Sequence, residues 1–153
     1  MNVKFLVLIH VLSAIIGVGP TFFAHVLLRR NQTLEELRMS LRVGRRLEIF
    51  PKIGGSIAVL SGLLLIWLGD YGSFMQIWLL GSLIAYVLIQ IIAIGFATPN
   101  QKKLGGWVLD PTNLQETALP GDQILLWAKA RNYFYAASTV GVILFIFMIL
   151  KPS

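Results

Sequence analysis

Apolar residues in this chain are grouped into long runs rather than alternating with polar ones. The four longest runs cover residues 5–28, 53–68, 75–97 and 133–150, and the second gains length from Ile49 and Phe50. A helix rises about 1.5 Å per residue, so about 20 apolar residues cross the hydrocarbon core of a bilayer. The pattern therefore predicts four membrane-spanning helices, at residues 5–28, 50–69, 75–97 and 132–150.

The polar segments between these runs divide unequally in charge. Ten basic residues lie within residues 29–49 and 98–131, whereas only Lys4 and Lys151 lie near the opposite ends of the runs. Basic loops of membrane proteins stay in the cytoplasm, so we expect both of these loops to be cytoplasmic and both termini to face outward. Because the other connections are short, residues 1–153 are predicted to form one all-α domain, an antiparallel four-helix bundle in a bacterial inner membrane.

The first predicted loop contains a helix of its own. Thr33 and Glu36 have the spacing of a capping box, in which each side chain accepts a backbone N–H at the start of a helix. Leucines then recur at helical spacing, at Leu34, Leu37 and Leu41. We therefore expect an amphipathic basic helix that lies on the inner headgroups. Its contacts with anionic lipid would come from Arg38, Arg42, Arg45 and Arg46.

The second predicted loop is the one long irregular segment that we expect, at residues 99–119. Asp110 to Asn113 is typical of a turn, because it combines Asp, Pro and Asn. Asp122 is a suitable N-cap for a helix that continues into the fourth span.

Composition agrees with a membrane protein. The chain is 56% hydrophobic and 13% charged, against about 25% charged in typical soluble proteins. The absence of cysteine excludes disulfides and thiolate metal sites. The formal net charge of +6 does not indicate nucleic-acid binding, because the basic residues flank the apolar runs instead of forming a soluble module.

The first span carries a stripe of small and polar residues on one helix face. Its members are His10, Ser13, Ala14, Gly17, Thr21, Ala24 and His25. We expect this stripe to face the interior of the bundle, where Tyr86 and Gln90 of the third span could donate hydrogen bonds to it. Small residues also recur every fourth position in the second span, at Gly54, Ala58 and Gly62, which predicts close helix packing.

The first span holds the only two histidines of the chain, and ionisable groups within a span are candidate functional sites. Fifteen residues of helix separate them by about 22 Å, so they cannot bind one metal ion together. Met75 and Met148 are expected at the outer level of His10, where the three could hold haem b or copper. The alternatives for His10 are a structural hydrogen bond or, less favoured, a proton relay, and His25 could lie among the headgroups.

Three short segments resemble known membrane families. They are the start of the first span after His10, the stretch from Arg45 to Pro51, and the last helix from Arg131. The second and third segments resemble parts of the haem-associated membrane protoporphyrinogen oxidases, and the first resembles a group of small bacterial predicted integral membrane proteins of unknown function. That group is similar in turn to copper-resistance D-like domains and to the haem-associated membrane protoporphyrinogen oxidases. The resemblance to the oxidases implies a haem-ligand role for His10.

Two classes of function remain open from the sequence. The leading hypothesis is a membrane protein that binds haem b or a metal ion around His10 for redox or cofactor handling. The alternative is a non-catalytic transport or assembly subunit, acting as a homodimer or within a larger membrane complex. A proton-linked transporter is disfavoured, because no span contains a carboxylate.

Overall fold

The computed structural model describes residues 2–73 and 75–152, and these are helical except for short connections. Helix α1 (Val3–Leu27) is followed by α2 (Leu34–Leu47) and α3 (Ile49–Leu68). After a tight connection come α4 (Ile77–Gln90), the π-helical η1 (Ile91–Ala97) and α5 (Thr98–Val108). The 3₁₀ turn η2 (Pro111–Asn113) then leads to α6 (Gly121–Leu150).

Four helical stretches are long and apolar enough to cross a membrane, which confirms the predicted all-α, four-span fold. They are Val3–Leu27, Leu34–Leu68, Ile77–Val108 and Gly121–Leu150. Three of them have 30 residues or more, which corresponds to about 45 Å and exceeds the roughly 30 Å of a hydrocarbon core. These three helices are therefore longer than the hydrocarbon core is thick.

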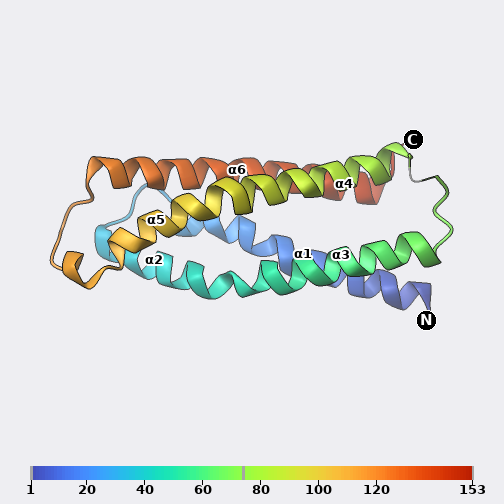
Figure 1. Cartoon of the computed structure of the whole chain (residues 1–153), viewed down its shortest axis with the longest axis horizontal. Helices are drawn as coiled ribbons and strands as arrows, with labels where there is room; N and C mark the ends of the chain where they lie inside the picture. The colour runs from blue at the N-terminus through green and yellow to red at the C-terminus, as the bar shows by residue number, and fades with distance from the viewer. Residues whose placement is uncertain (1, 74, 153) are drawn as a thin grey trace.

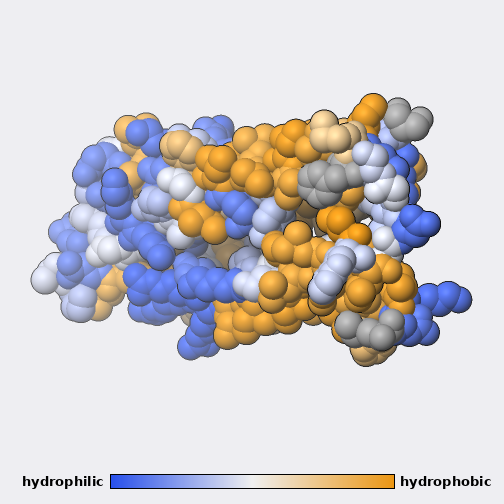
Figure 2. Space-filling model, turned by 45° about the vertical axis from the view of Figure 1, so that its right-hand side comes forward, coloured by the Kyte–Doolittle hydropathy of each residue, from blue (hydrophilic) through white to orange (hydrophobic). Residues whose placement is uncertain are grey.

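The helices pack as two antiparallel pairs. Helix α1 packs most extensively against α3, and α4 against α6, while contacts between α1 and α6 join the pairs. Figure 1 shows α1 and α3 along one side and α4 and α6 along the other, with both termini at the same end. Figure 2 shows the surface hollowed between the two pairs towards that end. The bundle is therefore packed most completely at the opposite end.

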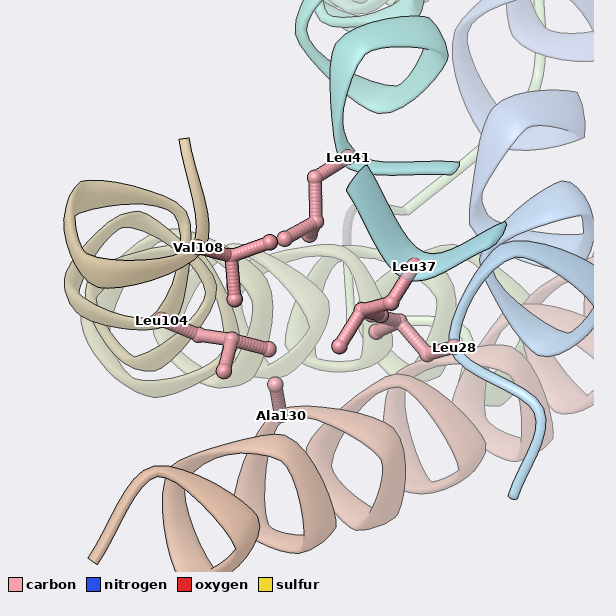
Figure 3. Packing of buried hydrophobic residues seen from close by; sticks show 6 residues of the cluster. All are labelled: Leu28, Leu37, Leu41, Leu104, Val108 and Ala130. Carbon is pink, nitrogen blue, oxygen red and sulfur yellow. The ribbon is translucent and has the colours of Figure 1, made fainter. Parts of the chain in front are cut away.

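That opposite end, which we call the basic end, consists of α2, α5, the last turn of α1 and the first turns of α6. Its core contains Leu28, Leu37, Leu41, Leu104, Val108 and Ala130. Figure 3 shows these side chains converging from α2, α5, α6 and, for Leu28, the residue that follows α1. Blue, hydrophilic residues cover most of the outside of this end, an orange, hydrophobic band covers the middle, and blue residues appear again at the far end (Figure 2). This is the part of the molecule that resembles a small water-soluble bundle.

Helix α2 begins as the sequence predicts but packs differently. The capping box of Thr33 and Glu36 is present, with both hydrogen bonds formed. Its apolar face is covered by protein and not by lipid, because Leu37 and Leu41 are buried against other helices. The contact of its arginines with anionic headgroups stays a prediction. Moreover, α2 continues almost directly into α3 (Figure 1). An amphipathic pattern shows that a face is apolar but does not show whether lipid or protein covers it.

The segment after the third span is also more ordered than predicted. Residues 98–108, expected within an irregular loop, form α5 despite Pro99. The π-helical segment explains this, because the N–H of Thr98 bonds to the carbonyl of Ala93, five residues earlier. Pro99 then lies in the first turn of α5, where its missing N–H costs little.

The connection from α5 to α6 is held by specific hydrogen bonds. The predicted turn is present, and the Asp110 carboxylate accepts the N–H and the hydroxyl of Thr112. These two bonds lower the pKa of Asp110. The guanidinium of Arg38 donates to the carbonyls of Asn113 and Glu116. Helix α6 starts at Gly121 with Pro120, and not Asp122, at its N-cap.

Candidate functional site

His10 joins α1 to α3 through its imidazole ring. Its Nδ1 atom lies 2.8 Å from the carbonyl oxygen of Ala58 and 3.2 Å from the hydroxyl of Ser61. A carbonyl oxygen can only accept, so Nδ1 of the neutral ring carries the proton and Nε2 keeps its lone pair. The Ser61 hydroxyl itself donates to the carbonyl of Ile57. His10 is therefore held in one tautomer by the helix it packs against.

Glycines on α3 make room for this arrangement. A Cβ atom at Gly62 would lie 2.9 Å from Cε1 of His10, so the ring occupies the space that a side chain would need. Further along the same seam, a Cβ atom at Gly54 would lie 2.6 Å from the backbone nitrogen of Gly17. The small-residue series in the first two spans thus forms the α1–α3 contact, as the sequence predicts.

The polar stripe of α1 faces the interior of the protein. Ser13, Gly17 and Ala24 are buried, and the other four members of the stripe are half-buried. The remaining faces of α1 expose large apolar side chains, which suits contact with lipid. The stripe thus lies on the more buried side of α1.

His25 lies at the contact between α1 and α6. Its Nε2 atom is 2.7 Å from the hydroxyl of Ser138, and its ring stacks on Tyr135 with the centroids 4.4 Å apart. The Nδ1 atom of His25 is buried without a hydrogen-bond partner among the described residues. Each histidine of the stripe thus joins α1 to a different helix.

The other candidate residues are distributed over separate parts of the fold. Met148 packs against the α4–α6 cluster of Ala85, Ile89 and Leu144. Met75 is 72% exposed and lines a shallow depression of about 440 Å³ with Trp78 and Lys151. No described contact brings either methionine to His10. Tyr86 and Gln90 are half-buried, and neither makes a side-chain hydrogen bond to another described residue.

The sequence did not indicate which residues, Ala58 and Ser138, would be the hydrogen-bond partners of the two histidines. Ala58 acts through its backbone carbonyl, which no residue type reveals. Ser138 was detectable as one of the few hydroxyls in the fourth span, but its pairing with His25 depends on how α1 and α6 pack. Within residues 2–73 and 75–152, no three His, Cys, Asp or Glu side chains come together as a metal-ligand group.

Comparison with known proteins supplies a family but no activity. A family model described as a predicted integral membrane protein (DUF2269) matches residues 4–152. No curated protein and no solved structure matches the chain. The predicted resemblance to an uncharacterised integral membrane family is thus confirmed, whereas the one to copper-resistance D-like domains and haem-associated oxidases gains no support. Since the match covers almost the whole chain, this protein belongs to that family of predicted integral membrane proteins.

Proposed function

We propose that this membrane protein holds a haem group through Nε2 of His10 and serves in redox or cofactor handling. The observation that carries the proposal is the hydrogen bond from Nδ1 of His10 to the Ala58 carbonyl. Metal-ligating histidines characteristically donate their other N–H to such an acceptor, which fixes the tautomer and makes the free nitrogen a better ligand. Ser61 and Gly62 add a polar neighbour and the space for the ring.

The contacts around His10 favour haem over a bare metal ion. A metal ion bound only by protein needs several side-chain ligands, and His10 has no second ligand residue among its described contacts. A haem supplies four ring nitrogens of its own and needs one axial protein ligand. The proposal therefore depends on His10 alone and does not require Met75 or Met148.

Absorption spectroscopy of the purified protein tests this proposal. Protein in detergent, supplied with hemin and then reduced with dithionite, should show a Soret band that shifts on reduction. The variant H10A should lose that band. H25A is the matched control, because it removes the other histidine of the same helix and should keep the band. A spectrum that is the same for wild type and H10A would overturn the proposal.

The alternative function is a non-catalytic subunit of a larger membrane assembly. It is favoured by the observation that His10 already bonds to α3 at the glycine seam, which is a sufficient structural role. Under this alternative, the protein stays colourless after exposure to hemin, and H10A lowers the thermal unfolding midpoint. Cross-linking in native membranes would then recover the protein bound to larger membrane proteins.

A further inference from the structure

Arg131 is a buried cation without a described carboxylate partner. Its side chain lies at the junction of α1 and α6, and the residue is only 8% exposed. Among residues 2–73 and 75–152, the ion pairs are Arg29 with Glu36 and Lys52 with Glu48. A buried charge is costly unless it is paired and hydrogen-bonded, so a counter-ion is expected at this position.

The hydrogen bonds of Arg131 do not compensate for its charge. A guanidinium has five N–H donors. The Nη1 atom of Arg131 donates a long hydrogen bond, of 3.4 Å, to the carbonyl of Leu28. Trp127 already donates to the same oxygen at 2.8 Å. The Nε atom of Arg131 is buried with no described partner. The hydrogen bond to the carbonyl at the end of α1 therefore leaves other N–H donors of Arg131 without a described partner.

A second cation lies near the same end of α1. Arg30 follows Leu28, whose carbonyl accepts the hydrogen bond from Arg131, by two residues, and Arg30 is exposed. The ring of Trp127 lies 5.8 Å from the Arg131 guanidinium and covers it on one side. Two cations held near each other beside an aromatic ring form a site for an anion rather than for another cation.

The position of Arg131 along α6 indicates which anion this is. Arg131 precedes Leu150, the last residue of the helix, by 19 residues, which corresponds to about 29 Å of helix. That length matches the roughly 30 Å of a hydrocarbon core, so Arg131 lies at headgroup level when Leu150 lies at the far boundary. Tryptophans such as Trp127 are enriched at this level.

We propose that Arg131 and Arg30 bind the phosphate of an anionic membrane lipid at the junction of α1 and α6. The planar guanidinium of Arg131 matches two phosphate oxygens, and Arg30 adds the second positive charge. Basic pockets between membrane helices bind anionic headgroups in this way. The site is distinct from His10, which lies near the other end of α1.

Lipid-dependent thermal stability tests this site. In neutral detergent, added phosphatidylglycerol should raise the unfolding midpoint of the wild type in a saturable manner, whereas phosphatidylcholine should not. The variant R131Q should weaken the apparent phosphatidylglycerol affinity roughly tenfold or more, as expected for the loss of a charge-assisted contact. K129Q is the matched control, because Lys129 is an exposed cation two residues away on the same helix.

A second variant keeps the test decisive if R131Q does not fold. Arg30 is exposed and outside the core, so R30Q should fold and should also weaken the lipid effect. Equal phosphatidylglycerol affinity in wild type and R30Q, or in wild type and folded R131Q, would overturn the proposal. Stabilisation by soluble glycerol phosphate as strong as that by phosphatidylglycerol would overturn the assignment to a lipid.

Discussion

Gly17 and Gly54 set the distance between α1 and α3. A Cβ atom at Gly54 would lie 2.6 Å from the backbone nitrogen of Gly17 and 2.8 Å from the carbonyl oxygen of Ser13. These neighbours are backbone atoms of a helix, so they cannot move aside as a flexible side chain could. Because lipid does not drive helices together, this close contact is a main source of α1–α3 association.

Replacing Gly54 with alanine should therefore weaken the helix pair. We expect G54A to lower the free energy of unfolding by about 1–3 kcal/mol, the usual cost of overpacking, with a lower thermal unfolding midpoint in detergent. G55A is the control, because a Cβ atom at Gly55 meets nothing within 4 Å. It should leave the midpoint unchanged or raise it slightly, since alanine is the better helix former. Equal midpoints for the two variants would contradict this account of the seam.

The separate helices are linked at the basic end by side chains from α2. Arg38 reaches the connection between α5 and α6, where its Nη2 atom donates to the carbonyls of Asn113 and Glu116 at 2.9 and 3.1 Å. Those carbonyls belong to a segment with little regular structure of its own. The order of this connection thus depends on a helix about 75 residues earlier in the chain.

Removing that link should loosen the connection and leave the helices intact. We expect R38Q to speed amide hydrogen exchange in residues 110–119 and to make this segment more sensitive to protease. R42Q is the control, since Arg42 is an exposed arginine one turn further along α2. Unchanged exchange in R38Q would show that the connection is ordered by other contacts.

At the level of the helices, hydropathy was sufficient to predict the four spans but not their extent. The apolar runs of the sequence stop where polar residues begin. The helices are longer than these runs because Leu104, Val108 and Ala130 are buried against other helices of the protein. The third span was predicted to end at residue 97, whereas the chain continues through the π-helical η1 into α5. Sequence periodicity predicted the face of α1 that packs, but not that Ala58 and Ser138 would be the partners of its histidines.

In the whole molecule, the two ends differ in packing and in charge. The basic end has a closed leucine-rich core, whereas the two helix pairs separate towards the end that carries the termini (Figures 1 and 2). Three of the four spanning helices are also longer than the hydrocarbon core is thick. Which side of the membrane it occupies is predicted by charge alone, since ten of the 13 basic residues lie within residues 29–49 and 98–131.

Because the chain has no cysteine, single cysteine substitutions can test this orientation without a background signal. Asp70 lies in the connection before α4, and Lys103 lies on α5 at the basic end; both are exposed. We expect a membrane-impermeant maleimide to label D70C in intact cells and K103C only after permeabilisation. The opposite result would place the basic end outside. It would also move the proposed phosphate site of Arg131 to the outer leaflet, because that site and Lys103 lie towards the same end of the bundle.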